Sequence, residues 1–500
     1  MDSLLSRVAA VAAATPRRVA IVDGGRRIDY GSLWQQARNF AGDLQHQGLQ
    51  PGDRVAVVLP NRIEAVVACY GAWLARAVVV PLNVQARQRD LLPWLQHCDP
   101  RCVVHERGHA DVEQALAALV QPPRAIVLDA AAPLPSFPPR HPAWFGPETY
   151  PGRPAAIVYT SGTTGAPKGV TLSHANLVSN AGAVASYLGL RGGDSVLSVL
   201  PFYYAYGASV LHTHLISGAR VVLEPNLLFP HAIVDTTARE AVTGFSGVAS
   251  TYALLLDHGG LGQRELPALR YLTQAGGAMA PSMAGRLRAA VPRARLFVMY
   301  GQTEATARVT WLPPEQLEKR PGCAGRPLRG TELRIVREDG HEARTGESGE
   351  VQVRGPGVML GYWNNPTATA RVIDDGWLRT GDVGHLDRDG YLYLAGRRSD
   401  MIKTGAHRVY PGDIEEAIAE LPGVAEVAVV GVDDAVLGQV VKAFVVTSRP
   451  LPRGGDAVKA HCRARLAPYK VPREVEFVAA LPRTASGKVR RVELKEEALT

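Results

Sequence analysis

A loop rich in glycine and hydroxyl side chains is the segment best suited to hold an anion. Residues 160–169 read TSGTTGAPKG and directly follow an apolar run at 155–159. The glycines let backbone N–H groups face an anion, four hydroxyls can donate further hydrogen bonds, and Lys168 adds positive charge. Gly169 stands where a Walker A loop has Ser or Thr, so this is a different phosphate loop. A flexible surface loop is the alternative, but the hydroxyls, the lysine and the preceding strand favour an anion site.

Three further segments place charged side chains at strand ends or beside glycines. Residues 300–304 (YGQTE) end an expected strand at 296–299, and open α/β sheets bind ligands at such ends. Asp382 follows a Thr-Gly pair, Arg397 follows a glycine, and residues 484–491 read TASGKVRR. Considered alone, the Thr-Glu pair at 303–304 is typical of a helix cap, Asp382 and Arg397 would more often form a surface ion pair, and residues 484–491 are typical of a basic surface tail.

The elements expected to position these residues alternate between strands and helices. Apolar residues recur at three- and four-residue spacing between 33 and 44, which predicts a buried helix stripe. A strand at 55–59, a helix at 64–74 and a strand at 77–80 follow. This alternation predicts α/β layers with largely parallel sheets. Ten prolines between residues 121 and 154 predict an irregular connector before the next strand.

The pattern changes twice toward the C-terminus. From 328 to 353 short strands with glycine turns predict a small β-rich unit, and from about 399 a helix, two strands and a helix predict a separate α+β unit. We therefore expect an α/β fold with a large N-terminal domain of layered sheets at 1–398. It includes the β-rich subdomain at about 325–398, and a small, mobile α+β domain follows at 399–500.

Composition narrows the class of protein. The chain has 500 residues, 46% of them hydrophobic, with a formal net charge of +8 that suits anionic small molecules. The basic residues form no dense block, so we expect no nucleic-acid partner. Five cysteines without paired spacing argue against a disulfide framework or a zinc site. Arg7 interrupts the apolar start, which predicts an amphipathic helix rather than a signal peptide. No run approaches the ~18–20 apolar residues of a membrane span, so a soluble cytoplasmic protein is expected.

The sequence resembles the adenylate-forming superfamily: acyl- and aryl-CoA synthetases, luciferases and the adenylation domains of peptide synthetases. The phosphate loop of that family reads SGTTGxPKG, and residues 161–169 match every fixed position. Further motifs occur in the family's order between about residues 15 and 491. The resemblance implies that ATP and Mg²⁺ are used to convert a carboxylic acid into its acyl-AMP.

The resemblance also assigns roles to individual residues. It implies catalytic roles for Lys168, Thr303, Glu304 and Lys488, with Glu304 binding Mg²⁺ and Lys488 reaching the α-phosphate and the substrate carboxylate. Binding of ATP or AMP is implied for Thr160, Ser161, Gly162, Thr163, Thr164, Gly165, Gly277, Ala278, Tyr300, Gly301, Asp382 and Arg397.

The acid is expected to bind between the motif at 201–207 and the turn at Gly276. The resemblance implies that its pocket is formed by Tyr203, Tyr204, Tyr206, Tyr252 and Gly276. Many family members have histidine at the first two of these positions. Amino-acid-activating domains hold the α-amino group with an aspartate near here, and none of residues 205–208 is acidic. A carboxylic acid with an apolar or aromatic body is therefore expected.

The acceptor of the acyl group is less defined. Lys403, Gly405 and Ala406 resemble the family's thioester-forming segment, and Ser399 occupies its hinge. Residues 453–491 include ten basic residues and only three acidic ones. This local excess of positive charge suits the phosphates of CoA or the acidic face of a carrier protein. CoA is the leading acceptor. A carrier protein's phosphopantetheine and direct amide formation are the alternatives, as is a catalytically inactive nucleotide-binding protein. Retention of Lys168, Glu304, Asp382, Arg397 and Lys488 argues against the last.

Overall fold

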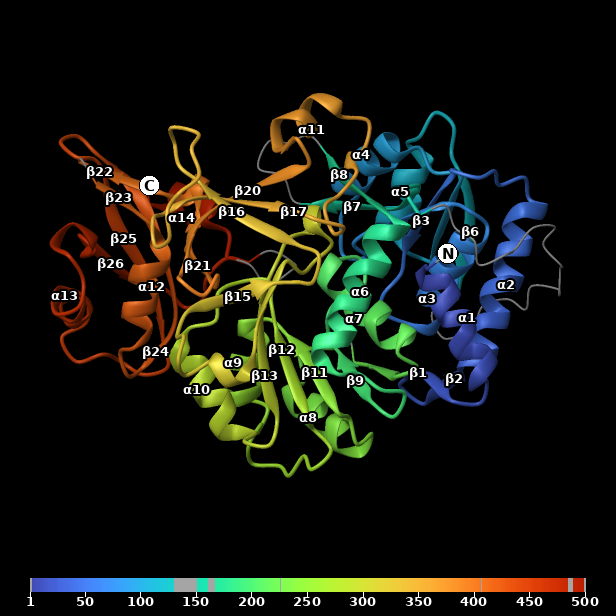
Figure 1. Ribbon diagram of the computed structural model, residues 1–500, viewed down its shortest axis with the longest axis horizontal. Helices are drawn as coiled ribbons and strands as arrows, with labels where there is room; N and C mark the ends of the chain where they lie inside the picture. The colour runs from blue at the N-terminus through green and yellow to red at the C-terminus, as the bar shows by residue number, and fades with distance from the viewer. Residues whose placement is uncertain are drawn as a thin grey trace.

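The computed structural model of the protein describes residues 2–129, 151–160, 167–224, 226–405, 407–483 and 489–498. Two large sheets with helices between and around them form most of the molecule. A smaller sheet built from the C-terminal segment lies at one end (Figure 1). The predicted fold class, α/β with a large N-terminal and a small C-terminal domain, is confirmed.

The largest sheet joins a parallel half to an antiparallel half. Neighbouring strands run parallel from β1 to β13 and antiparallel from β13 to β16, so the change falls at β13. The short β19 (Ile373–Asp374) pairs with β20. In spatial order the strands are β16 (Glu332–Val336), β17 (Gly349–Arg354), β20 (Trp377–Leu386), β21 (Leu392–Arg397), β15 (Cys323–Pro327), β14 (Thr310–Leu312), β13 (Arg295–Tyr300), β12 (Tyr271–Gln274), β11 (Gly244–Gly247), β9 (Ser195–Ser198), β10 (Arg220–Leu223), β1 (Val19–Asp23) and β2 (Arg26–Asp29).

The second sheet is parallel from β6 to β7 and antiparallel from β7 to β18. Its strand β3 is buried on both faces: Val55 and Val57 pack into the central core, whereas Ala56 and Val58 pack into a separate outer cluster. This alternation follows from the two-residue repeat of a strand. In spatial order the strands are β18 (Gly361–Tyr362), β8 (Lys168–Ser173), β7 (Pro154–Thr160), β4 (Val78–Pro81), β3 (Arg54–Val58), β5 (Cys102–Glu106) and β6 (Arg124–Leu128).

The strand β6 corrects the prediction of an irregular connector from 121 to 154. Residues 124–128 pair in parallel with β5 in continuous register, and Ile126 and Leu128 are buried. The prolines that suggested a connector flank this short apolar run but do not interrupt it. Residues 130–150 lie outside the described part of the chain.

Helices fill the space between the two sheets and cover their outer faces. α3 is buried at every residue except Cys69, as expected for a helix enclosed on all sides. α2 crosses it closely at Gly71, where a Cβ atom would lie 2.7 Å from the ring of Phe40. The helices of the large domain are α1 (Leu4–Ala14), α2 (Tyr30–His46), α3 (Ile63–Leu74), α4 (Gln88–Cys98), α5 (Ala110–Ala117), α6 (His174–Leu188), α7 (Ala205–Ile216), α8 (Pro230–Arg239), α9 (Ala249–Asp257), α10 (Pro281–Ala290) and α11 (Pro366–Val372).

The third sheet and three helices come from the last hundred residues. The strands, in spatial order, are β23 (His407–Val409), β22 (Ile402–Thr404), β25 (Gly438–Thr447) and β24 (Val424–Asp434), with β26 (Glu474–Phe477) also paired to β25. The helices are α12 (Pro411–Ala419), α13 (Gly455–Arg463) and α14 (Arg491–Glu497). Among the helices that the structure describes, none has both the length and the apolar character needed to cross a membrane.

Candidate active site

The predicted phosphate loop closes a β-hairpin between β7 and β8. Thr160 ends β7, Lys168 begins β8, and the two residues are direct cross-strand partners. A Cβ atom on Gly169 would lie 2.7 Å from Ile157 Cγ2, so this position needs glycine for packing as well. The loop residues between these strands lie outside the described part of the chain, including Ser161, Gly162, Thr163, Thr164 and Gly165.

Three residues predicted to bind AMP meet at one point of the large sheet. Asp382 and Arg397 are cross-strand partners on β20 and β21, and Arg397 Nε lies 2.8 Å from Asp382 Oδ1. Tyr300, the last residue of β13, donates its hydroxyl to Asp382 Oδ2 at 2.5 Å. Burial, and then the nearby Asp382 carboxylate, raise the pKa of Tyr300, so it remains a neutral donor. Asp382 is buried, at 6% exposed, whereas the side chain of Arg397 is exposed, so the ion pair lies at the edge of the buried interior.

Glu304 lies between the large sheet and the hairpin of the phosphate loop. It belongs to the short 3-10 helix η1 (Thr303–Ala305) that follows β13, and its Oε1 accepts a hydrogen bond from Tyr362 Oη at 3.1 Å. Tyr362 of β18 pairs with Val170 of β8, so the hydrogen bond connects the predicted metal ligand, through β18, to the strand that begins with Lys168. Sequence reasoning missed Tyr362, because an uncharged aromatic residue after a glycine carries no chemical signal.

The surroundings of Glu304 fit a nucleotide-bound Mg²⁺ rather than a protein-caged metal. No group of three or more His, Cys, Asp or Glu residues that could hold a metal occurs among the described residues. Mg²⁺ on a nucleotide usually takes one or two carboxylates, with phosphate oxygens and water completing its coordination. A single carboxylate with a fixed orientation meets that requirement.

The glycine turn after β12 is open, as close approach of a ligand requires. Gly276 has a φ of 88°, a left-handed conformation that favours glycine. A Cβ atom on Gly277 would meet no atom within 4 Å. Gly276, Gly277 and Ala278 are all exposed.

The predicted pocket tyrosines lie in different surroundings. Tyr206 and Tyr252 both donate to the carbonyl oxygen of Thr273 on β12, at 3.0 and 2.7 Å. Tyr252 is completely buried and also bonds the carbonyl of Phe245 at 3.2 Å, so it braces β11 against β12. Tyr203 packs edge-on against Tyr204, with ring centroids 4.6 Å apart.

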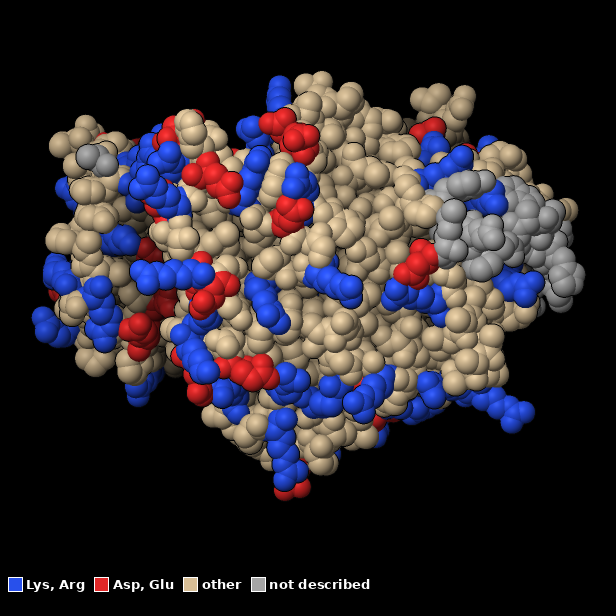
Figure 2. All heavy atoms as spheres, in the orientation of Figure 1, with Lys and Arg blue, Asp and Glu red and all other residues tan. Residues whose placement is uncertain are grey.

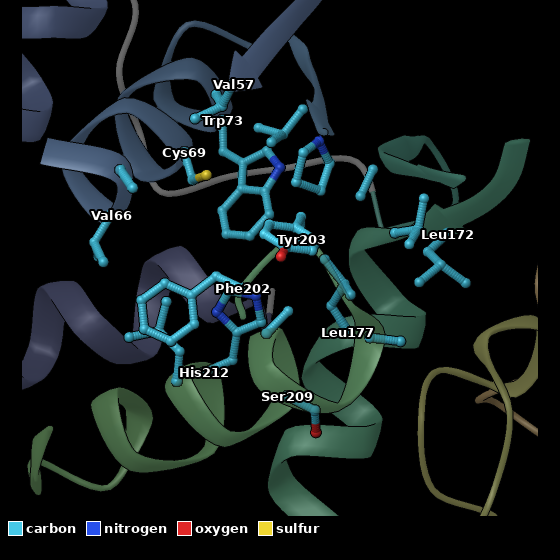
Figure 3. A pocket seen from close by; sticks show the side chains of 18 of the residues that line it. Val57, Val66, Cys69, Trp73, Leu172, Leu177, Phe202, Tyr203, Ser209 and His212 are labelled. Carbon is cyan, nitrogen blue, oxygen red and sulfur yellow. The ribbon is translucent and has the colours of Figure 1, made fainter. Parts of the chain in front are cut away.

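A cavity of about 60 Å³ lies on the other side of the motif at 201–207. It is bounded by α3, α6, α7 and the second sheet, and apolar atoms dominate its walls. In Figure 3 the side chains of Trp73, Tyr203 and His212 surround this space. Burial lowers the pKa of His212 to about 3, so the imidazole is neutral there. Of the five predicted pocket residues only Tyr203 lines this cavity, which therefore differs from the space expected beside Gly276.

The C-terminal residues predicted to act in the two half-reactions are only partly described. Lys403 lies on β22 and is exposed, Gly405 follows with a φ of 56°, and Ser399 is exposed in η3 (Arg398–Asp400). Ala406 and Lys488 lie outside the described residues. Figure 1 places β22 and β23 at the outer end of the molecule, well away from β7 and β8.

The positive charge of the C-terminal segment is smaller than its local sequence indicates. Of its nine basic residues that the structure describes, six form ion pairs: Arg465, Lys470, Arg473, Arg483, Arg490 and Arg491. Five of these pairs use acidic residues that lie earlier in the chain than residue 453. Figure 2 accordingly shows acidic side chains among the basic ones on this face of the domain.

Comparison with known proteins agrees with this architecture. Residues 8–363 match the family described as AMP-binding enzyme, and residues 413–488 match the AMP-binding enzyme C-terminal domain. The chain belongs to the AMP-binding enzyme family. The resemblance inferred from the motifs is thereby confirmed.

Relatives and solved structures match over nearly the whole chain. A feruloyl-CoA synthase from an Amycolatopsis species is 35% identical over 96% of each chain. A 2-succinylbenzoate–CoA ligase from Bacillus licheniformis is 34% identical over 96% of this chain and 97% of its own. The o-succinylbenzoate CoA synthetase of Bacillus subtilis, solved with its acyl-adenylate intermediate, is 30% identical with a TM-score of 0.86, covering 98% of this chain and 97% of its own.

Proposed function

We propose that the protein joins a carboxylic acid to coenzyme A in two steps. In the first step the acid reacts with MgATP to give acyl-AMP and pyrophosphate, and in the second the thiol of CoA displaces AMP. The observation that carries this proposal is the meeting of Tyr300, Asp382 and Arg397 at the end of β13, the strand that pairs with β12 beside the glycine turn. Full-length similarity to named CoA ligases supports it.

The proposed roles follow from the charges that the first step must bring together. A substrate carboxylate oxygen attacks the α-phosphorus, the bond to the bridging oxygen breaks, and pyrophosphate leaves. Lys168 and Lys488 would offset the negative charge, and Glu304 would hold the Mg²⁺ that the nucleotide carries. Preorganised charges of this kind typically contribute a factor of about 10²–10³ each to the rate. No covalent nucleophile is needed, because positioning and charge stabilisation suffice.

Asp382 is proposed to bind the ribose. A carboxylate can accept about four hydrogen bonds, so the ribose hydroxyls would share it with Arg397 and displace the Tyr300 hydroxyl. The open turn at Gly276 and Gly277 would allow the adenine to lie against the backbone. Lys403, Gly405 and Ala406 would serve the thiol step after rotation of the C-terminal domain about Ser399, with the domain boundary at 398–399.

The acid is proposed to have an apolar or aromatic body. The relatives named above act on aromatic acids by their names, and the walls of the pocket region are rich in tyrosine. We also place the protein in the cytoplasm. All five cysteines are free, which agrees with a reducing compartment.

A pyrophosphate-release screen tests the proposal directly. Purified protein is given MgATP and a panel of acids, with and without CoA, and both nucleotides and thioesters are measured. At least one acid should give pyrophosphate, AMP and an acyl-CoA, with faster turnover when CoA is present. Formation of ADP, or pyrophosphate release with α-amino acids alone, would reject it.

A further inference from the structure

Arg308 is a buried arginine whose charge is not matched by any ion pair among the described residues. Arg308 is 3% exposed. The Nε and Nη1 atoms of its guanidinium have no hydrogen-bond acceptor. The other buried arginine of the described chain, Arg62, is bound to Glu64 at 2.6 Å and Glu106 at 2.7 Å. A guanidinium cannot shed its proton in a protein, so burial without an anion costs free energy.

The loop after η1 fixes the position of Arg308. Thr306 and Ala307 have φ values of 54° and 75°, a left-handed conformation that residues other than glycine adopt rarely. A Cβ atom on Gly301 would lie 2.1 Å from Ala307 O, so the loop folds tightly against the end of β13. Asn180 Nδ2 donates to Arg308 O at 2.9 Å and holds the main chain from α6. Arg308 is therefore rigidly connected to the segment that carries the proposed metal ligand.

The guanidinium lies against Tyr206, one of the residues predicted to form the acid pocket. Arg308 Cζ is 4.4 Å from the ring centroid of Tyr206, whose hydroxyl donates to Thr273 O. Tyr206 belongs to the motif at 201–207 and lies in the first turn of α7, and Thr273 precedes the turn at Gly276. Tyr206 thus bridges the two segments that are expected to enclose the acid. The ring face attracts the cation but has no net charge, so it does not neutralise the guanidinium.

A second unpaired donor lies at the other end of η1, on the residue that precedes it. Gln302 Nε2 is buried and has no hydrogen-bond partner. Donors without acceptors, together with one uncompensated positive charge, suit an anionic ligand. A planar guanidinium binds a carboxylate through two parallel hydrogen bonds and gives geometric selectivity as well as affinity.

We propose that Arg308 binds a second anionic group on the substrate acid. The preferred substrates would carry the carboxylate that is activated and, at the far end of the acid, a further carboxylate, sulfonate or similar group. This inference rests on the proposed function, since it assumes that the space around Tyr206 receives the acid. It refines that function by adding an anionic end to the apolar or aromatic body.

The test compares diacids with their neutral partners. Pyrophosphate release is measured for a series of aliphatic and aromatic dicarboxylic acids, each beside its monomethyl ester, with sulfonate-terminated acids as a third arm. The wild-type protein should favour a diacid or sulfonate over the matched ester. In Arg308→Met that ratio of kcat/KM values should fall at least about thirtyfold, the loss expected when one partner of a buried charge pair is removed. Arg308→Lys, which keeps the charge but not the fork, should give an intermediate ratio.

Thermal denaturation supplies the matched control. Arg62→Met removes the arginine bound to Glu106 and leaves Glu64 with Arg26 alone, so its Tm should fall while the diacid-to-ester ratio stays that of the wild type. Arg308→Met leaves no acidic side chain without an ion-pair partner. The Tm of this variant without ligand should therefore equal or exceed that of the wild type. Equal loss of activity toward diacid and ester in Arg308→Met would show a structural role and overturn the inference.

The role of Arg308 and the proposed function are refuted by different results. If the wild-type protein adenylates esters as well as diacids, the role of Arg308 is refuted and the proposed function stands. This comparison requires no variant. A wild-type protein that releases no pyrophosphate with any acid refutes the proposed function, and the inference with it. The sulfonate arm separates recognition of planar carboxylates from recognition of anions in general.

Discussion

Replacement of Asp382 by asparagine tests the proposed nucleotide site most sharply, because the substitution keeps the shape, removes the charge and replaces one acceptor oxygen by an NH2 donor. Hydrogen bonds to a charged group contribute about 1.5–3 kcal/mol, against about 0.5–1.5 kcal/mol for neutral pairs. In Asp382→Asn, the hydrogen bond from each of the two ribose hydroxyls would therefore contribute about 1–1.5 kcal/mol less to the binding free energy. The total of about 2–3 kcal/mol predicts an AMP affinity lower by about 30- to 150-fold.

The matched control is Tyr300→Phe. The Tyr300 hydroxyl occupies Asp382 Oδ2 at 2.5 Å and would compete with the ribose, while its ring would remain in place. Removing the hydroxyl should therefore change AMP affinity by no more than about fivefold, the equivalent of one ordinary hydrogen bond. Isothermal titration calorimetry with AMP measures both variants without knowledge of the acid. Wild-type affinity in Asp382→Asn, or an equal loss in both variants, would refute the ribose assignment.

Three further predictions concern the metal, the two half-reactions and the hairpin. Glu304→Gln should lose most adenylation and recover part of it at high Mg²⁺, whereas Tyr362→Phe should shift the Mg²⁺ requirement only slightly. Both are measured by pyrophosphate release. If Glu304→Gln reacts at the wild-type rate at limiting Mg²⁺, Glu304 is excluded as a metal ligand. Lys488→Ala should abolish acyl-AMP formation but spare thioester formation from supplied acyl-AMP, and Ala406→Trp should do the reverse; single-turnover kinetics in which both variants slow the same step would reject domain alternation. Gly169→Ala should lower the free energy of unfolding by about 1–3 kcal/mol, because its Cβ would lie 2.7 Å from Ile157 Cγ2. Gly152→Ala, whose Cβ would meet no atom within 4 Å, is the control in thermal denaturation. Equal Tm values for the two variants would contradict the packing explanation.

The sequence predicted those features that depend on local patterns. Helix periodicity between residues 33 and 44 predicted α2, and apolar runs predicted β3 and β4, because side-chain burial repeats every 3.6 or 2 residues. β6 was not predicted, since the many surrounding prolines outweighed a five-residue apolar run. Its identity as a strand comes from pairing with β5, a contact that local sequence does not encode.

Contacts between distant segments were likewise beyond sequence reasoning. The pairing of Asp382 with Arg397 depends on the register of β20 and β21, and the hydrogen bond from Tyr300 depends on how β13 lies in the same sheet. The resemblance named these residues individually but did not predict that the carboxylate already has both partners. The contact of Arg308 with Tyr206 joins residues about a hundred positions apart. A single arginine in the run that follows the YGQTE motif was the only available sign.

Isotope transfer tests the central claim, that the acid is activated as its acyl-AMP. An acid found in the screen is labelled with ¹⁸O in its carboxylate and incubated with the protein, MgATP and CoA, and the nucleotide products are analysed by mass spectrometry. Attack of the carboxylate on the α-phosphorus predicts one ¹⁸O atom in the released AMP and none in pyrophosphate. Unlabelled AMP, or label appearing in inorganic phosphate beside ADP, would contradict the account.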